Sequence, residues 1–365
     1  MIENERINVT KVFLPNQDEY QKILKSSWDK CWMTNRGDLV LELETKLKSK
    51  YQINNVILTT NGTLPIQIAI KTLGLTGEII TTPFSYVATT SSIAWEGLTP
   101  VFADIEVDTF TIDPLKIEEK VTNKTSAILA THVFGNPCDV DAIETIAKKH
   151  NLKVIYDAAH SFGVVYKGKS MFNYGDVSTC SFHATKIFHT AEGGALFSQH
   201  KELHDKLYYH HNFGHNGPEH FHGIGINAKM SELQAAMGLT VWPYLEGIFS
   251  RRELLYKLYL KHLDSRLSFQ KIRLETTYNY SYFPVVFESE AQLLKIVKVL
   301  NDHNIFPRRY FYPSLNTLPY LKSDKMPASE ALSVKILCLP LYFDLKEEQV
   351  KTICGLINKN LNQIE

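Results

Sequence analysis

The sequence has few cysteines and no long apolar segment. The five cysteines of the 365-residue chain are odd in number and scattered, and no two of them have CxxC spacing. This pattern is typical of buried free thiols in a reducing compartment rather than of a disulfide framework. No apolar run approaches the roughly 18 to 20 residues that a membrane helix needs, and the N-terminus lacks a charged segment followed by an apolar one. We therefore expect a cytoplasmic protein with no membrane partner.

The sequence also lacks an excess of charge of either sign. Lys plus Arg and Asp plus Glu both number 39, so the formal net charge is zero. This balance argues against bulk electrostatic binding to nucleic acid or to an anionic membrane. There is no internal repeat and no low-complexity linker. The apolar content of 44% and the charged content of 21% are ordinary for a globular protein, and the length suffices for about two domains.

What the sequence does contain is an alternation of short apolar runs with helical patterns. The runs that we interpret as strands are VILTT, EIITT, PVFADIE, SAILATHVFG, LKVIYDAAH, VSTCSFH and GGALFS. Helical patterns lie between several of them, for example over 139–150. Strands that alternate with helices predict an α/β fold with a large, mostly parallel sheet covered on both faces. We assign this large domain to residues 1–246.

Beyond residue 246 the pattern changes. Residues 278–287 are interpreted as a strand, 291–300 as a helix, and Asp344 as the N-cap of a last helix. These elements predict a smaller α+β domain over 247–365. The first 20 or so residues are expected to pack near it.

Four residues with useful chemistry follow the ends of predicted strands. They are Gly62, Tyr86, Asp157 and Lys186. In open α/β sheets, ligands bind beyond the carboxyl ends of the strands. This shared position is the strongest argument from the residues alone that the chain has a single site.

Each of these residues also has a plain structural interpretation. Lys186 could form a Schiff base with an aldehyde cofactor, but most such lysines are solvated. Gly62 could direct backbone amides at a phosphate before a helix, or form a tight turn. Tyr86 could cover a flat cofactor or pack in the core. Asp157 could pair with a protonated pyridine nitrogen, or cap the next helix.

Longer motifs join these residues and carry a family resemblance over nearly the whole chain. They include NGT at 61–63, PFSYVAT, THVFGNPCDVD, YDAAHSFG, SFHATK, GINAKMSELQAA and RRYFYPSL. The chain resembles the nucleotide-sugar aminotransferases, which are fold-type I enzymes dependent on pyridoxal 5'-phosphate (PLP). The likeness is greatest to enzymes that aminate a dTDP-4-keto-6-deoxyhexose to give dTDP-4-amino-4,6-dideoxyglucose (viosamine). It implies L-glutamate as the amino donor, a homodimer with shared active sites, and a product used for O-antigen or another lipopolysaccharide glycan.

The resemblance also implies residue roles. Lys186 would be the Schiff-base lysine and proton shuttle, and Asp157 would hold the pyridine nitrogen. The other implied cofactor contacts are Gly62, Thr63, Tyr86, His160, Ser181 and Asn227, the last reaching the cofactor of the neighbouring subunit. The implied substrate contacts are His183, Lys229, Arg309, Tyr310 and Tyr312.

The sequence departs from the family pattern at three of its positions. His160 stands where many relatives have glutamine, Asn61 replaces a common serine, and Lys229 replaces a frequent arginine, so the planar fork needed for a bidentate contact is missing there.

Other functions remain open at this point. An enzyme acting on the 3-keto isomer is a close alternative. Nine histidines between His183 and His222 could serve a metallohydrolase, although none shows HxxxH spacing backed by a carboxylate, and we expect no metal. A non-catalytic sensor of the same fold is a third class, and Lys186 argues against it. Sugar dehydratases of this fold carry histidine at that position.

Overall fold

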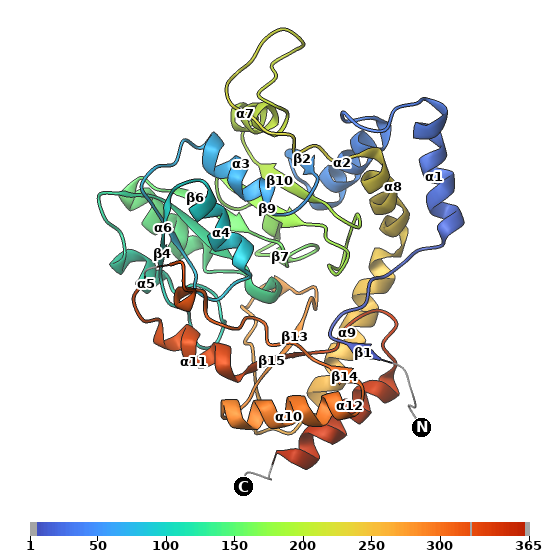
Figure 1. Ribbon diagram of the computed structural model, residues 1–365, viewed down its shortest axis with the longest axis vertical. Helices are drawn as coiled ribbons and strands as arrows, with labels where there is room; N and C mark the ends of the chain where they lie inside the picture. The colour runs from blue at the N-terminus through green and yellow to red at the C-terminus, as the bar shows by residue number, and fades with distance from the viewer. Residues whose placement is uncertain (1–5, 322, 362–365) are drawn as a thin grey trace.

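The computed structural model describes residues 6–321 and 323–361 (Figure 1). Its largest sheet has seven strands in the order β2-β10-β9-β6-β5-β3-β4. Along the chain these strands are β2 (Asn55–Thr59), β3 (Glu78–Thr81), β4 (Thr99–Phe102), β5 (Thr125–Thr131), β6 (Lys153–Asp157), β9 (Val177–Ser181) and β10 (Gly194–Ser198). β10 runs antiparallel to both of its neighbours, and the other pairings are parallel. The expected mostly parallel sheet is confirmed.

Both faces of the sheet are buried under helices. Successive side chains of a strand point to opposite faces, so neighbouring residues belong to different apolar clusters. In β5, Ala127 and Leu129 belong to one apolar cluster, whereas Ile128 and Ala130 belong to another. On the first face lie α3 (Leu64–Thr72), α4 (Val87–Trp95) and α7 (Lys201–His211). On the second face lie α2 (Asp38–Tyr51), α5 (Pro114–Glu119), α6 (Val140–His150) and α8 (Glu232–Val241). The result is a three-layer sandwich.

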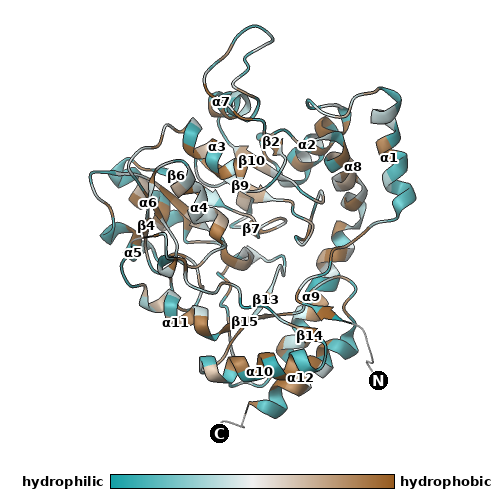
Figure 2. Cartoon of the chain, in the orientation of Figure 1, coloured by the Kyte–Doolittle hydropathy of each residue, from teal (hydrophilic) through white to brown (hydrophobic). Residues whose placement is uncertain are grey.

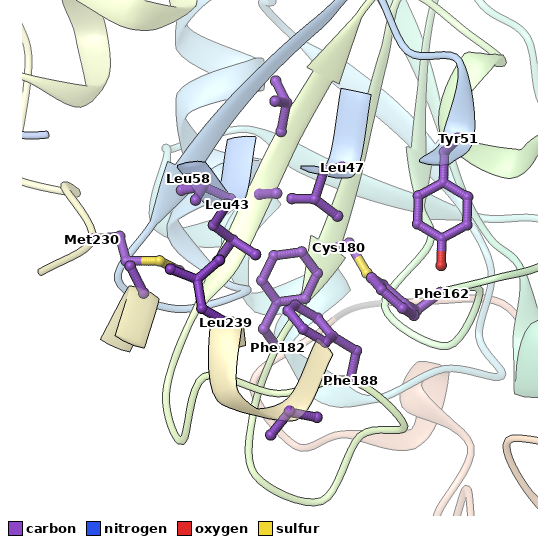
Figure 3. Close-up of a cluster of buried hydrophobic side chains, with 14 of the residues drawn as sticks. Leu43, Leu47, Tyr51, Leu58, Phe162, Cys180, Phe182, Phe188, Met230 and Leu239 are labelled. Atoms are coloured by element: carbon purple, nitrogen blue, oxygen red, sulfur yellow. The ribbon is translucent and has the colours of Figure 1, made fainter. Parts of the chain in front are cut away.

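One end of the second face is packed with aromatic rings beneath the loop that carries Lys186. Figure 3 shows Phe162, Phe182 and Phe188 grouped with leucines from α2 and α8. The Phe162 and Phe188 rings are stacked with centroids 4.6 Å apart. Dense packing of large rings limits local movement. The loop after β9 therefore rests on a rigid base.

The C-terminal part contains a small antiparallel sheet, β11 (Ser268–Phe269), β13 (Phe283–Val286) and β15 (Ile336–Leu339). Its helices are α9 (Leu245–His262), α10 (Glu290–Asp302), α11 (Pro327–Lys335) and α12 (Glu347–Asn360). Figure 2 shows that α10 and α12 carry both hydrophilic and hydrophobic residues. Their apolar residues share a core with α9, β13 and β15. The domain division at residue 246 stays a prediction.

The N-terminal segment contacts both parts of the molecule. Strand β1 (Ile7–Asn8) pairs in parallel with β14 (Ile305–Phe306) of the C-terminal part. Helix α1 (Gln17–Asp29) then packs against α8.

A small sheet also connects distant parts of the chain. Strand β12 (Thr276–Thr277) pairs with β7 (Val165–Tyr166), which itself pairs with β8 (Lys169–Ser170). This small three-stranded sheet joins the C-terminal part to the hairpin between β6 and β9.

Two predicted boundaries were wrong. The last helix begins after Lys346 rather than at Asp344, whose carboxylate does not cap the helix and lies 3.4 Å from the Lys11 ammonium. The strand expected over 278–287 is limited to β13, and the residues before it form a loop that enters the candidate site.

The prediction of buried free thiols is confirmed for four cysteines and is wrong for Cys31. All five cysteines are free, with Cys31 exposed and the other four buried. Within residues 6–321 and 323–361, no helix is long and apolar enough to cross a membrane.

Candidate active site

The loops that follow four strands of the large sheet supply the candidate site. β2 leads through Gly62 into α3, and β3 leads through Tyr86 into α4. Asp157 is the last residue of β6, and β9 leads through a turn to Lys186. Because β2, β3, β6 and β9 are parallel members of one sheet, these positions lie along one edge.

Lys186 is half-buried in a small pocket. Its backbone N–H donates to the His183 carbonyl at 2.8 Å, which closes a tight turn. Its Nζ donates to the Tyr282 hydroxyl at 3.3 Å. The pocket is lined by Ala159, His160, Phe162, Thr185, Lys186, Ile187, Asn279, Ser281 and Tyr282. The lysine thus lies between the large sheet and the loop before β13, and the solvated interpretation is wrong.

Asp157 is buried, with 6% of its surface exposed. Its Oδ2 accepts a hydrogen bond from the Thr89 hydroxyl at 2.7 Å, and its Oδ1 accepts from the Ala159 amide at 3.0 Å. Burial raises the pKa of the carboxyl, although both hydrogen bonds and the charge of Lys186 oppose the rise. Both donors are neutral, so the buried carboxylate would be stabilised further by a cationic partner.

His160 is buried and held in one tautomer. Its Nδ1 accepts a hydrogen bond of 3.1 Å from the Phe134 amide. Burial, aided by the charge of Lys186, lowers the pKa of His160 well below its ordinary value. The ring is therefore neutral and carries its proton on Nε2. Phe134 has a φ of +59°, a strained conformation for a bulky residue, and this turn directs its N–H at His160.

The Asn61–Thr63 loop approaches Ser181 closely. A Cβ placed on Gly62 would lie 2.6 Å from the Ser181 Cβ, so only glycine fits there without movement. Asn61 Oδ1 accepts from the amides of Thr63 and Leu64, both at 2.9 Å, and so caps α3. Within the described residues the Gly62 N–H has no protein acceptor. This N–H and the hydroxyls of Thr63 and Ser181 are available to a ligand.

Tyr86 is 60% exposed at the N-terminus of α4, so the core-packing alternative is wrong.

Tyr310 is connected to Lys186 through Tyr282. Its ring centroid is 5.7 Å from that of Tyr282, which in turn accepts a hydrogen bond from Lys186. Burial is the main reason that the pKa of Tyr310 is raised to about 12. Tyr310 therefore lies beside the pocket as a neutral phenol.

Arg309 and Tyr312 contact each other rather than the lysine. The Arg309 guanidinium lies 3.6 Å from the centre of the Tyr312 ring. Its Nη2 donates to Glu290 at 2.6 Å and to the Val334 carbonyl at 3.2 Å. The guanidinium is thus held by residues of α10 and α11 in the C-terminal part.

Asn227 and Lys229 follow the segment that projects from the body after α7 (Figure 1), and Lys229 forms an isolated bridge with Thr59 at the end of β2. Asn227 is exposed and forms a bridge with Asn212, whose side chain also accepts from Lys229 Nζ at 2.9 Å. Burial lowers the pKa of Lys229. Neither side chain lines the Lys186 pocket of its own chain.

The histidine-rich stretch does not form a metal centre. His183 Nδ1 is 2.9 Å from the Thr185 hydroxyl, and its Nε2 is 3.7 Å from Glu192. His210 Nδ1 bonds the Ile224 carbonyl at 2.6 Å. Across the described ranges, no group of three or more His, Cys, Asp or Glu side chains could hold a metal ion.

Sequence reasoning missed two residues that contact the predicted pair. Thr89 lies one helical turn after Tyr86, and a hydroxyl so placed could have been proposed to face the end of the neighbouring strand. Tyr282 was assigned to a strand, and its sequence separation of 96 residues from Lys186 leaves no local signal of their contact.

The fold and the site together define a class: an α/β enzyme of PLP fold-type I, with a lysine and a buried aspartate at the carboxyl edge of the sheet. Residues 16–358 match the DegT/DnrJ/EryC1/StrS aminotransferase family. The chain belongs to this family. Its predicted cofactor class is confirmed, because the family depends on PLP.

Relatives of known name cover nearly the whole chain. The dTDP-4-amino-4,6-dideoxy-D-glucose transaminases of Shigella dysenteriae and Escherichia coli are 40% and 38% identical to it. Each alignment spans 97% of this chain and 98% of the relative. The crystal structure of DesI in the presence of its TDP-sugar product superposes with a TM-score of 0.93 at 30% identity, covering 98% of this chain and 94% of that chain.

The residues present fit PLP. When bound, PLP supplies an aldehyde for an amine and a ring that withdraws electrons from the reacting carbon. Asp157 offers a buried carboxylate to a cationic ring nitrogen, and His160 offers one N–H from Nε2. The Gly62 amide and the N-terminus of α3 suit a phosphate.

Proposed function

We propose that the protein transfers the amino group of L-glutamate to C4 of a dTDP-4-keto-6-deoxyhexose. In the net reaction the sugar loses its keto oxygen and gains an amino group, and glutamate becomes 2-oxoglutarate. The product is a dTDP-4-amino-4,6-dideoxy sugar of the viosamine type. The observation that carries the proposal is the 38–40% identity, over 97% of the chain, to two transaminases named for that product.

The residue roles belong to the same proposal. Lys186 attaches the cofactor through Nζ and, when free, moves a proton at the reacting carbon as a positioned base. Asp157 keeps the ring nitrogen cationic. Tyr86 covers the ring, and Gly62, Thr63 and Ser181 bind the phosphate. His160 donates its Nε2 proton to the cofactor.

The substrate contacts are proposed from position alone. His183 and Tyr310 lie beside the lysine turn and beside Tyr282, respectively. Arg309 and Tyr312 form a stacked pair on the C-terminal part. We propose that all four, together with Lys229, face the nucleotide-sugar or the amino acid in the complete site.

A shared active site in a homodimer is proposed for the projecting segment. This segment exposes Phe213, Phe221 and Ile224, and α1 with the turn after it exposes Trp28 and Trp32. Large apolar side chains grouped on a surface favour burial against a partner. A second copy would cover them and would bring its Asn227 to the cofactor phosphate. We also propose a cytoplasmic enzyme whose product enters an O-antigen or another lipopolysaccharide glycan.

The direct test is incubation with dTDP-4-keto-6-deoxyglucose, L-glutamate and PLP, followed by NMR assignment of the product. We expect nitrogen at C4 and one equivalent of 2-oxoglutarate. The matched control is the Lys186→Ala variant with the same substrates. Turnover of the 3-keto isomer but not of the 4-keto sugar would refute the C4 assignment. If neither keto-sugar is aminated, the alternative of a non-catalytic sensor of the same fold would be revived.

The shared site can be tested by mixing two inactive variants. Lys186→Ala lacks the attaching amine, and Asn227→Ala lacks the contact donated to the neighbour. Random exchange of subunits gives mixed dimers in which one site is intact, so we expect about a quarter of wild-type activity. No recovery, with exchange demonstrated by mass, would show that each site uses the Asn227 of its own chain.

A further inference from the structure

The phenol of Tyr282 lies directly against the amine of Lys186. Lys186 Nζ donates a hydrogen bond of 3.3 Å to Tyr282 Oη, and the ammonium lies 5.8 Å from the centre of the same ring. Tyr282 comes immediately before β13, in the C-terminal part of the chain, whereas Lys186 follows β9 of the large sheet. The contact therefore joins the lysine to the part of the molecule that covers the pocket.

Aromatic rings hold Tyr282 in place. It is 9% exposed, and its ring packs edge-on against His160 with centroids 4.9 Å apart. The Phe134 ring lies 5.4 Å away and the Tyr310 ring 5.7 Å away, each at a different angle. A ring confined on three sides has little rotational freedom, so its hydroxyl is fixed in direction.

The backbone that carries Tyr282 is fixed as well. Asn279 Nδ2 donates to the carbonyls of His160 and Phe162 at 2.8 and 2.9 Å, and Ser281 Oγ donates to the His160 carbonyl at 2.7 Å. On the other side, the buried Arg252 guanidinium donates to the Ser281 carbonyl at 3.3 Å. The segment is thus tied both to the loop after β6 and to α9.

We propose that Tyr282 is a positioning residue that holds the amine of Lys186 whenever that amine is not joined to the cofactor. A free lysine has a flexible four-carbon stem, so its amine keeps a fixed position only if a fixed group accepts a hydrogen bond from it. The Tyr282 hydroxyl accepts such a hydrogen bond at 3.3 Å. This inference rests on the proposed attachment of PLP to Lys186.

The test compares Tyr282→Phe with Tyr280→Phe in the full-length protein after removal of PLP. Tyr282→Phe deletes the hydroxyl and keeps the ring that packs on His160. Tyr280 belongs to the same loop, but its hydroxyl bonds Glu253 on α9 at 3.1 Å, and Tyr280 does not line the Lys186 pocket. The rate of covalent PLP capture is followed by stopped-flow absorbance. Affinity for pyridoxine 5'-phosphate, which has the same ring and phosphate but no aldehyde, is measured in parallel.

We expect Tyr282→Phe to slow PLP capture about 3- to 10-fold, as the loss of one ordinary hydrogen bond does, with affinity for pyridoxine 5'-phosphate unchanged. Tyr280→Phe should match the wild type in both measurements. Wild-type capture by Tyr282→Phe would overturn the inference. An equal loss of pyridoxine 5'-phosphate affinity would also overturn it, since that would indicate packing. Capture by Lys186→Ala at the wild-type rate would instead refute the proposed attachment itself.

Discussion

Replacing Gly62 by alanine tests the proposed phosphate site through a clash that the structure defines. The added Cβ would lie 2.6 Å from the Ser181 Cβ and 2.9 Å from both its Cα and its Oγ. All three are shorter than the 3.4 Å at which ordinary van der Waals contact begins. Two of these atoms are the Cα and Cβ of Ser181 at the end of β9, so side-chain rotation cannot relieve the clash. The loop after β2 must move away from β9.

The size of the effect follows from that movement. Overpacking by one methyl group costs about 1–3 kcal/mol. In the PLP-free protein the loop can open and relieve most of this strain, but a phosphate held between Gly62, Thr63 and Ser181 requires the loops to close. We therefore expect the cost to appear as a loss of PLP affinity of about 5- to 150-fold.

The assay is an absorbance titration with PLP, accompanied by thermal unfolding of the PLP-free protein. The matched control is Gly247→Ala on α9, where an added Cβ has nothing within 4 Å; alanine there should stabilise the helix by up to about 1 kcal/mol and leave PLP binding unchanged. Wild-type PLP affinity in Gly62→Ala would refute the reasoning, because the two loops would then not need to meet around the phosphate.

Three further predictions concern buried polar groups. Asp157→Asn should retain PLP but lower kcat about 10- to 150-fold, since the charged hydrogen bond proposed between Asp157 and the ring nitrogen is lost. An unchanged kcat in steady-state kinetics at saturating PLP would contradict this. Glu232→Ala removes the carboxylate that accepts hydrogen bonds from the Leu39 and Val40 amides at 2.8 and 3.2 Å. Urea denaturation should show a free energy of unfolding lower by about 3 kcal/mol. The control Glu246→Ala breaks only an exposed ion pair with Lys50 and should lower the free energy of unfolding by less than about 1 kcal/mol. Burial lowers the pKa of His132 from 6.5 to about 3, so the unfolded chain binds a proton there that the folded chain does not. The contribution of His132 to stability is therefore complete above pH 6.5 and is lost toward pH 3 by about 1.4 kcal/mol per pH unit, and the buried His160 and His211, whose pKa values are also lowered, add to this loss. A flat pH dependence of urea unfolding between pH 6.5 and 4.5 would contradict this.

The strand ends were predictable because their signal is local. Apolar runs mark buried strands, and a parallel sheet brings their carboxyl ends to one edge. Gly62, Asp157 and Lys186 each follow such a run, so their convergence required only the correct fold class. The lysine and aspartate are thereby placed together without any information about side-chain packing.

Contacts that depend on how distant segments dock were not predictable. Tyr282 reaches Lys186 only because Asn279 and Ser281 tie its loop to the backbone after β6. The tautomer of His160 depends on the strained turn at Phe134, for which the residue type gives no hint. In each case tertiary contacts rather than local patterns determine the geometry.

One boundary error concerns the last helix. Asp344 is a favourable N-cap residue by type, but its carboxylate is close to Lys11 from the N-terminal segment. The helix begins instead after Lys346, whose amide donates to Gln349 Oε1 at 2.9 Å. The residue type at one position did not show which of two nearby positions begins the helix.

The central claim is that the amine at position 186 carries the cofactor. Reduction of the PLP-loaded enzyme with borohydride would convert that attachment into a stable secondary amine, which peptide mass mapping can locate. We predict a single pyridoxyl adduct on Lys186 and none in the Lys186→Ala variant treated in the same way. An adduct on a different lysine of the wild type would contradict the account.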